Sequence, residues 1–257
     1  MSGEIMIELN HISAGYGKTE ILHDITLAFA PGTVTTVLGI NGCGKSTLLK
    51  TLVRLLPLTS GEILVDGVSA EKYAPAELAK KIAYLPQNRN IPDMTAAQLV
   101  LHGRFAHLHY PRVYRKTDTD AAERAMETLG ITALADQPLS ALSGGMRQKV
   151  YLAAALAQES PAILMDEPTT FLDIAGQLRL AQTIRSLADA GKTMILVLHD
   201  LPLALKLSDR LAVLREGHLL DCGTPEEILA RGSLERAYQI KIHPVRTENG
   251  VDYVCGL

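Results

Sequence analysis

One short segment constrains this chain more than any other: a glycine-rich loop between a strand-forming run and a helix-forming run. Residues 39–46 read Gly-Ile-Asn-Gly-Cys-Gly-Lys-Ser, which fits the phosphate-binding pattern G-x-x-x-x-G-K-[ST]. The run Thr33–Leu38 predicts a strand before the loop, and Thr47–Leu56 predicts a helix after it. Such a loop turns backbone N–H groups toward an anion at a helix N-terminus. We therefore expect a nucleotide site in which Lys45 reaches the β- and γ-phosphates and the Ser46 hydroxyl ligates Mg²⁺.

Composition narrows the class of protein. The chain has 257 residues, of which 47% are hydrophobic and 21% charged, and this balance excludes a disordered chain. With 25 basic and 28 acidic residues the formal charge is −3, which gives no general attraction to nucleic acid. Cys43, Cys222 and Cys255 are odd in number and far apart, as in a reducing compartment. The start carries no secretory signal, and apolar stretches such as Val150–Ala157 are shorter than the roughly 18 residues of a membrane span. We expect a soluble, intracellular protein.

Strand-forming and helix-forming runs alternate along the chain, which predicts an α/β fold with a parallel or mixed sheet. The middle differs, because residues 95–158 are a block of helix-forming patterns. We therefore expect one domain with a core at about 1–87 and 160–257 and a helical subdomain inserted at 88–159. A hairpin is expected around Glu248–Val251 because Asn-Gly stands there between strand formers. The other predicted strands are Met6–Leu9, Glu62–Val65, Ile82–Leu85, Ala162–Met165, Met194–Leu198 and Leu211–Leu214; the other predicted helices are Thr95–His109, Asp118–Leu129, Gly144–Gln158 and Ile174–Ala190, the last capped by Gly191.

Two adjacent carboxylates end one of the apolar strands. Ile163–Met165 leads into Asp166, Glu167 and Pro168. By itself this pattern is a solvated strand end, but beside a phosphate loop it supplies the rest of a hydrolytic site. We predict that Asp166 faces Mg²⁺ and that Glu167 is the general base that activates water for attack on the γ-phosphate.

A third motif lies about twenty residues before Asp166. Residues 142–148 read Leu-Ser-Gly-Gly-Met-Arg-Gln, and together with the two motifs above they make the whole chain resemble the ATPase subunit of an ABC (ATP-binding cassette) transporter. The resemblance implies a P-loop NTPase (RecA-like) core with an antiparallel β subdomain and an inserted helical subdomain. It also implies that ATP is bound by Tyr16, Gly39, Asn41, Gly42, Cys43, Gly44, Lys45, Ser46 and Thr47.

Further positions acquire roles only from that resemblance. Tyr16 matches the aromatic residue that stacks on adenine, and Gln87 matches the glutamine that approaches Mg²⁺, alongside Ser46 and Asp166. His199 matches the histidine that contacts the γ-phosphate. Asp173, in Phe171-Leu172-Asp173, matches the aspartate of a loop that communicates between subunits.

The resemblance also implies a second copy of the chain. One chain has a single Lys45 and a single signature segment, and family members place ATP between the lysine of one subunit and the signature of another. Ser143, Gly144 and Gly145 would therefore act in trans, in a dimer that closes on two ATP molecules.

Two positions depart from the family pattern. Met146 stands where Gln or Glu is usual, which removes a polar contact. Cys43 replaces a commoner Ser or Ala, and its place beside Lys45 at a helix N-terminus predicts a lowered thiol pKa. We therefore expect thiol alkylation to inhibit the enzyme and Mg-ATP to protect it.

The subfamily is indicated by smaller features. His102-Gly103-Arg104 with Phe105 and Pro111, Ile174–Gln177 and Gly42–Gly44 most resemble ATPases of bacterial importers for ferric siderophores, haem or cobalamin, with ferric siderophores leading. The partners implied are integral membrane permease subunits and, indirectly, an extracytoplasmic substrate-binding protein; nucleic acid is not expected. The chain would then lie peripherally on the cytoplasmic face of the membrane. An ABC exporter, or a soluble ABC ATPase that acts on ribosomes or DNA, remains an alternative.

Clustered polar residues of the insert have a plainer interpretation. His102, His107 and His109 lack a completing Cys or carboxylate, so a surface is favoured over a metal site. Arg112, Arg115 and Lys116 are expected to form a solvated loop, with partner contact as the alternative.

Overall fold

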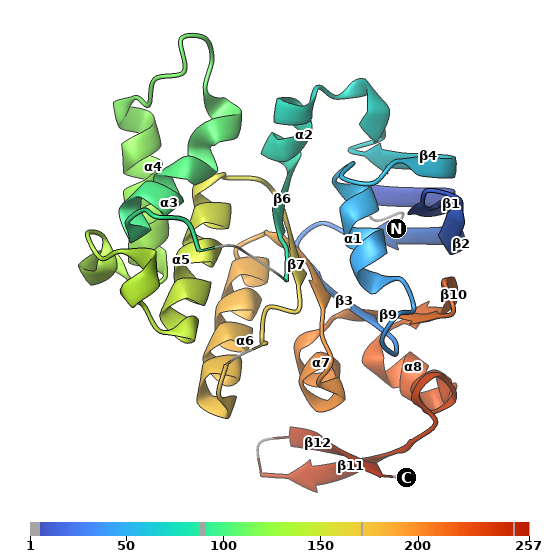
Figure 1. The fold of residues 1–257 in the computed structure, drawn as a ribbon. Helices are drawn as coiled ribbons and strands as arrows, with labels where there is room; N and C mark the ends of the chain where they lie inside the picture. Colours follow the sequence, from blue (N-terminus) through green and yellow to red (C-terminus); the bar gives the residue numbers. More distant parts are fainter. Residues whose placement is uncertain (1–5, 88–90, 171, 249, 257) are drawn as a thin grey trace. The chain divides into compact units, whose positions relative to one another are not determined.

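A computed structural model describes residues 6–87, 91–170, 172–248 and 250–256 (Figure 1). The chain forms two compact units, one made of residues 1–72 and 184–257 and the other of residues 73–183. The predicted helical insert at 88–159 lies within the second unit, and α6 (Ile174–Asp189) crosses the boundary between the two. The fold is α/β, as expected.

The first unit contains an antiparallel sheet of four strands in the order β2-β1-β4-β5. These strands are β1 (Ile7–Tyr16), β2 (Thr19–Phe29), β4 (Leu58–Val65) and β5 (Val68–Ser69). The sequence predicted only pieces of β1 and β4 and omitted β2. Yet β2 carries a period-two pattern, since Ile25, Leu27 and Phe29 are buried and alternate with more exposed residues.

Four further strands of this unit follow one another in the order β10-β9-β3-β8. They are β3 (Val34–Leu38), β8 (Thr193–Val197), β9 (Arg210–Arg215) and β10 (His218–Gly223). β3 is parallel to both β8 and β9, and every residue of β3 and β8 is buried, as in strands covered on both faces. The loops that follow β3 and β8 therefore emerge at the same edge.

The helix after the glycine-rich loop is shorter than the sequence suggested. α1 runs over Lys45–Leu52, so the predicted extension to Leu56 is wrong. Arg54 takes a left-handed conformation at φ 57°, and Pro57 disfavours helical geometry in the residue before it. The chain then enters β4 at Leu58.

The end of the first unit adds helices α7 (Leu201–Leu207), α8 (Pro225–Ala230) and α9 (Ser233–Tyr238), and a hairpin. The predicted hairpin is confirmed: β11 (Lys241–Thr247) pairs with β12 (Gly250–Gly256), and Thr247 lies opposite Gly250. Asn249 of its turn lies outside the described residues. An ion pair between Lys206 and Asp252 joins α7 to the hairpin.

The second unit combines a short parallel strand pair with packed helices. β6 (Ile82–Leu85) pairs in parallel with β7 (Ala162–Asp166). Helices α3 (Ala96–His102), α4 (Lys116–Thr128) and α5 (Gly144–Ala157) pack against one another (Figure 1), and α2 (Pro75–Lys81) leads into β6. The helix predicted at Thr95–His109 is α-helical only to His102 and continues as a 3-10 turn over Gly103–His107.

A buried charge cluster joins the helices of this unit. Arg104 is 6% exposed. Its Nε lies 3.2 Å from Asp118 Oδ1, and its Nη1 lies 2.7 Å from both Glu159 Oε2 and the carbonyl oxygen of Ala157. A Cβ at Gly103 would lie 2.1 Å from the carbonyl oxygen of Ala154, so only glycine permits this approach to α5. The His-Gly-Arg segment that marked the subfamily therefore has a packing role here.

Candidate nucleotide site

The glycine-rich loop leaves β3 and enters α1 as the motif requires. Asn41 and Gly42 at its tip are exposed, whereas Gly44, the N-cap of α1, is buried with φ 105°. The first-turn N–H groups of α1, which have no partner within a helix, begin at Lys45. Gly39, at the root of the loop, has φ 152°, and a Cβ there would lie 2.3 Å from the carbonyl oxygen of Leu214. The backbone thus has the form of an anion cradle.

Lys45 is held under this loop. Its side chain is buried, and Nζ donates to the carbonyl oxygens of Gly39 at 2.7 Å and Ile40 at 3.0 Å. The Cys43 carbonyl accepts a hydrogen bond of 3.2 Å from the Gly217 N–H, which ties the loop to the β9–β10 turn. The ammonium group of Lys45 is therefore hydrogen-bonded directly to the phosphate loop.

The expectation of a lowered thiol pKa at Cys43 is wrong. Cys43 is 3% exposed, and burial raises the pKa of its thiol despite the opposing attraction of Lys45. Local spacing identified the positive neighbour but did not reveal how completely the thiol leaves water. The alkylation expected from a reactive thiol loses its basis.

His199 and Tyr16, two more predicted site residues, lie in the same unit as the loop. In the parallel pair of β3 and β8, Val37 lies opposite Val197, so Gly39 and His199 each stand two residues beyond paired positions. His199 is exposed and precedes α7, which Asp200 caps through the N–H of Leu203 at 2.8 Å.

Tyr16, which is 48% exposed, ends β1 beside the phosphate-loop helix. Its hydroxyl lies 3.3 Å from Nζ of Lys50 on α1, and the same Nζ lies 5.7 Å from its ring centroid. An exposed aromatic ring beside α1 suits the predicted stacking on adenine.

The second unit brings the predicted catalytic carboxylates together with Gln87. Leu85 of β6 lies opposite Met165 of β7, so Gln87 and Glu167 stand at matching positions beyond two parallel strands. Nε2 of Gln87 donates a hydrogen bond to Glu167. Asp166, which ends β7, is 2% exposed. A glutamine and a glutamate 80 residues apart in the chain thus meet because the strands are parallel and in register.

Glu167 has a further partner that the sequence did not reveal. Thr170 donates its hydroxyl to Oε2 of Glu167 at 3.3 Å, and the Thr170 N–H donates to the Glu167 carbonyl at 3.3 Å. Glu167 itself has φ 50°, an uncommon conformation for a residue other than glycine. In the sequence, the turn-favouring Pro168 is the one feature that could have indicated that Thr170 lies next to Glu167.

The signature segment begins α5. Ser143 is its exposed N-cap, and its Oγ accepts the N–H of Met146 at 3.3 Å. Gly144 and Gly145 form the first turn. Since Met146 is 45% exposed, its replacement of a polar residue leaves an apolar side chain at this surface. An exposed helix N-terminus of this kind can attract an anion.

Asp173 precedes α6 in the same unit and is a helix cap in this chain. Its Oδ1 accepts the N–H of Gly176 at 2.6 Å and lies 3.9 Å from Nη2 of Arg179. Its side chain is 78% exposed, so it is accessible to another subunit. Phe171, the first residue of this segment, lies outside the described residues.

Two of the three clustered histidines, His102 and His107, have structural partners. Nδ1 of His102 lies 3.3 Å from the Tyr114 hydroxyl, and Nε2 of His107 lies 2.8 Å from the Gln158 carbonyl. Arg112 lies over the ring of Phe105 at 4.8 Å. Within the described ranges, no group of three or more His, Cys, Asp or Glu side chains is placed to hold a metal ion.

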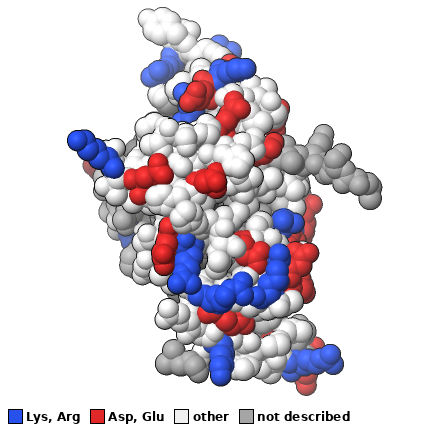
Figure 2. Space-filling view, turned by 90° about the vertical axis from the view of Figure 1, so that its right-hand side faces the viewer, with Lys and Arg blue, Asp and Glu red and all other residues white. Residues whose placement is uncertain are grey.

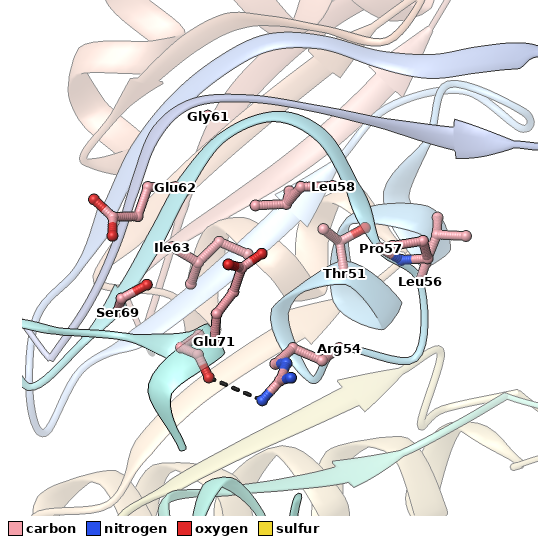
Figure 3. Close-up of a pocket in the computed structure, with 11 residues that line it drawn as sticks. Thr51, Arg54, Leu56, Pro57, Leu58, Gly61, Glu62, Ile63, Ser69 and Glu71 are labelled. Atoms are coloured by element: carbon pink, nitrogen blue, oxygen red, sulfur yellow. Dashed lines mark hydrogen bonds between the residues drawn. The ribbon is translucent and has the colours of Figure 1, made fainter. Parts of the chain in front are cut away.

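Other surface features involve residues that were not predicted as site residues. A pocket of about 360 Å³ opens at the end of α1, where Arg54 donates to the Ala70 carbonyl at 3.1 Å (Figure 3). The residues that line it, among them Thr51 and Glu71, are not ones that the motifs singled out. On the face drawn in Figure 2, described acidic side chains lie beside basic ones. In the lower half of that view, basic side chains form a continuous curved band that acidic side chains border.

Known proteins are similar to this chain in both sequence and fold. The ABC transporter family matches residues 22–170. The ferric enterobactin transport ATP-binding protein of Escherichia coli (strain K12) is 41% identical over 90% of this chain and 86% of its own. The iron(3+)-hydroxamate import ATP-binding protein of Bacillus subtilis (strain 168) is 36% identical over 97% of this chain and 93% of its own.

The structural comparison agrees. An inward-facing structure of a metal-chelate type ABC transporter aligns with a TM-score of 0.84 at 25% identity, over 98% of this chain and 96% of that one. In the part of the chain that is described, no helix is both long and apolar enough to cross a membrane. The chain has a phosphate loop, a strand that ends in carboxylates and a signature helix, and its relatives match over nearly their full length. It therefore belongs to the ABC transporter family and is one of its ATP-binding, ATP-hydrolysing subunits.

Proposed function

We propose that this chain energises the import of ferric siderophores by hydrolysing ATP on the cytoplasmic face of a membrane. The hydrolytic part rests on the hydrogen bond between Gln87 and Glu167 at the ends of paired parallel strands, next to buried Asp166. The transported substrate rests on relatives whose names refer to iron chelates. A relative from Halobacterium salinarum (strain ATCC 29341 / DSM 671 / R1) named for cobalamin import is 37% identical, although the match covers only 59% of its length. Cobalamin and haem are therefore the alternative substrates.

In this proposal the first unit binds the nucleotide. Tyr16 stacks on adenine, the exposed loop tip and the first turn of α1 donate N–H groups to the phosphates, and Lys45 turns from its loop carbonyls to the β- and γ-phosphates. His199, level with the loop root on the neighbouring strand, contacts the γ-phosphate. The residues assigned to binding are Tyr16, Gly39, Asn41, Gly42, Cys43, Gly44, Lys45, Ser46 and Thr47.

The three side chains proposed to hold Mg²⁺ each offer an oxygen ligand. Ser46 offers a hydroxyl in the first turn of α1, Asp166 offers a buried carboxylate, and Gln87 keeps its amide oxygen because its NH₂ group faces Glu167. Hard oxygen ligands of this kind suit Mg²⁺. When bound, the ion would neutralise charge on the β- and γ-phosphate oxygens.

Glu167 is assigned as the base. Its carboxylate accepts a proton from water as the water oxygen bonds to the γ-phosphorus, and the bond from that phosphorus to the bridging oxygen breaks to leave ADP. Gln87 and Thr170 donate to Glu167, and these two bonds orient its carboxylate.

A second copy completes the site. Ser143, Gly144 and Gly145 present the N-terminus of α5 to the ATP of the other subunit, and exposed Asp173 communicates across the same contact. The other partners are integral permease subunits and, through them, an extracytoplasmic binding protein. Nucleic acid is not a partner in this proposal.

Two substitutions test the hydrolytic assignment. Glu167→Gln should bind ATP, accumulate as a closed dimer on a sizing column, and lose about 10²–10⁴-fold in turnover. Lys45→Ala should instead lose nucleotide binding in calorimetry. Glu226→Gln, an exposed carboxylate of α8, is the matched control and should hydrolyse ATP normally. Wild-type turnover in Glu167→Gln would refute the assignment.

Reconstitution tests the transport assignment. The chain should co-purify with integral membrane subunits, and that complex should hydrolyse ATP faster when a binding protein loaded with ferric enterobactin or ferric hydroxamate is added. If only a binding protein loaded with cobalamin or haem stimulates ATP hydrolysis, the transported substrate is that alternative and not a ferric siderophore. Association with ribosomes and not with membrane subunits would overturn the transport function itself.

A further inference from the structure

The root of the phosphate loop is held by the far end of the chain. The backbone N–H of Gly39 donates a hydrogen bond of 2.7 Å to the hydroxyl of Tyr238, 199 residues later. Tyr238 is the last residue of α9, which lies beyond the 22–170 segment matched by the family. No motif in the sequence pointed to this contact.

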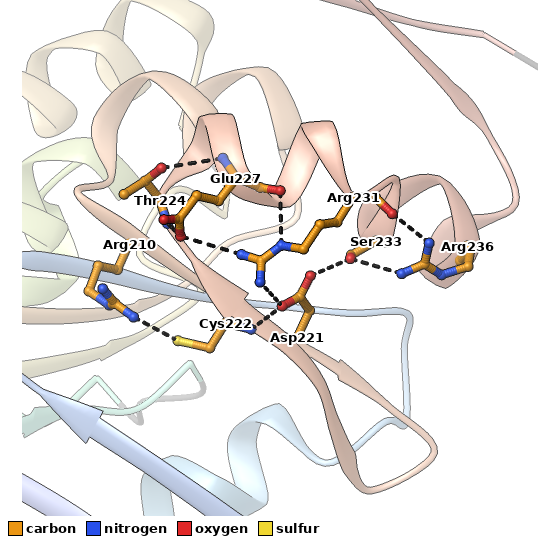
Figure 4. A network of polar contacts seen from close by, with 8 residues as sticks. All are labelled: Arg210, Asp221, Cys222, Thr224, Glu227, Arg231, Ser233 and Arg236. Atoms are coloured by element: carbon orange, nitrogen blue, oxygen red, sulfur yellow. Dashed lines mark hydrogen bonds and ion pairs between the residues drawn. The ribbon is translucent and has the colours of Figure 1, made fainter.

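A dense polar network fixes the helix that carries Tyr238 (Figure 4). Asp221 of β10 accepts the hydroxyl of Ser233, the first residue of α9, and pairs with Nη1 of Arg231 at 3.1 Å. Arg236 donates to the Ser233 hydroxyl at 3.0 Å. Ser233 is fully buried. The start of α9 is therefore fastened to a strand of the sheet that also contains β3.

The end of α9 is fastened as well. Nη1 of Arg215, the last residue of β9, donates to the Arg236 carbonyl at 3.2 Å. Gln239 ends the helix in a left-handed conformation, and its N–H donates to the Glu235 carbonyl at 2.8 Å. Tyr238 is thus presented by a helix anchored to two neighbouring strands.

Gly39 links Tyr238 to Lys45 through the two peptide groups that it joins. Its N–H is bonded to Tyr238, and its carbonyl oxygen accepts Nζ of Lys45 at 2.7 Å. The space around Gly39 is tight, since a Cβ would lie 2.5 Å from Sγ of Cys43. Burial raises the pKa of Tyr238 to about 12, so the hydroxyl stays neutral across the physiological range.

We propose that Tyr238 is a positioning residue of the nucleotide site: its hydroxyl holds the backbone of Gly39, and through it the loop and Lys45, in the conformation that receives phosphate. The inference rests on the proposed function, in which residues 39–47 hold the phosphates. Without the anchor the loop populates other conformations, and the apparent affinity for ATP falls by the fraction that stays competent. Chemistry on bound ATP is unaffected, because Glu167 and Gln87 belong to other elements.

Tyr238→Phe tests the proposal, because it keeps the ring and removes only the hydroxyl. We expect the Kd for ATP, measured by calorimetry at low temperature, to rise about 3–10-fold, in line with the net contribution of one intramolecular hydrogen bond. KM for ATP should rise in parallel, and kcat at saturating ATP should stay within about twofold of wild type. A purely structural role would lower the melting temperature and leave Kd unchanged, and that result would overturn the proposal.

Two further variants keep the test decisive. Tyr114→Phe, the matched control in the other unit, also loses a hydroxyl contact, at 3.3 Å to His102, and should bind ATP like wild type. Ser233→Ala loosens α9 at its start; it should weaken ATP binding less than Tyr238→Phe does and add nothing in the double variant. If the two effects on the Kd add in the double variant, Ser233 does not act through Tyr238, and the anchoring of Tyr238 by Ser233 is refuted. Lys45→Ala that still binds ATP would instead refute the proposed function, whatever Tyr238 does.

Discussion

Replacement of Arg104 by methionine probes the buried charge cluster of the second unit. The arginine side chain is 7% exposed and joins Asp118, Glu159 and the Ala157 carbonyl. Methionine has a similar length and keeps the apolar part of the side chain, so the change removes the charge and the donors and leaves little cavity.

The magnitude follows from what each partner retains. Asp118 is the partner most affected, because its side chain is 8% exposed and keeps only the Arg115 N–H, at 2.9 Å, among the donors described. Glu159 loses less, since it is 50% exposed and still pairs with Arg124 at 3.2 Å. Removing one partner of a buried pair costs about 3–5 kcal/mol, so we expect the low end, a loss of about 3 kcal/mol in the free energy of unfolding.

Urea denaturation followed by far-UV circular dichroism measures this loss, since the chain has no tryptophan. Arg104→Met with Asp118→Asn should recover about 1 kcal/mol or more, because the second change removes the buried charge. A loss below about 1 kcal/mol in Arg104→Met would refute the assignment of a buried, stabilising cluster.

The same cluster predicts that the free energy of unfolding depends on pH. The Arg115 N–H and then Arg104 lower the pKa of Asp118, and the arginines outweigh burial to lower that of Glu159. Since both folded pKa values are lowered, the stabilisation is complete above the ordinary carboxyl range and is lost as the pH falls through the folded values. The difference between wild type and Arg104→Met should therefore be full at neutral pH and shrink below about pH 4; a constant difference would contradict this.

Other residues give sharper local predictions. In native protein Cys255, which is exposed, should react with iodoacetamide before buried Cys43, as peptide mass spectrometry will show; equal rates would contradict the burial of Cys43. Gly39→Ala should lose ATP binding and about 2 kcal/mol or more of stability through its clash with Leu214, whereas Gly42→Ala, with open space around its Cβ, should lose less. Thr95→Ala removes the N-cap acceptor of α3 and should cost about 1 kcal/mol in thermal or urea unfolding.

The part of the site that could be predicted from sequence follows from short-range geometry. A phosphate loop needs only eight consecutive residues, and its strand and helix flank it directly. The family resemblance placed Gln87 near Mg²⁺ and did not predict its hydrogen bond to Glu167. The physical cause of that bond is simple: two parallel strands in register place residues at equal offsets side by side. The buried strands β7 and β8 matched the apolar runs that predicted them, and β3 matched the strand-forming run before the phosphate loop.

What the sequence did not disclose depends on distant contacts. The thiol of Cys43 has the positive neighbour that spacing predicted, but burial, which no local window reports, reverses the direction of its pKa shift. The anchor between Gly39 and Tyr238 spans 199 positions. The pairing of Arg104 with Glu159 likewise spans 55. In each case the residue types alone permit many partners, and only the packing selects one.

The exposure of the predicted groups bears on how the site is completed. Enzymes that finish their site within one chain surround the reacting atoms and exclude water. Here Asn41 and Gly42 of the phosphate loop, Ser143 at the start of α5, and Asp173 are all exposed. A helix N-terminus and a phosphate loop both attract anions, and both have exposed residues in this chain. ATP held between the loop of one copy and the α5 N-terminus of another would cover both. In the dimer of the proposed function, water exclusion and the trans contacts would arise together.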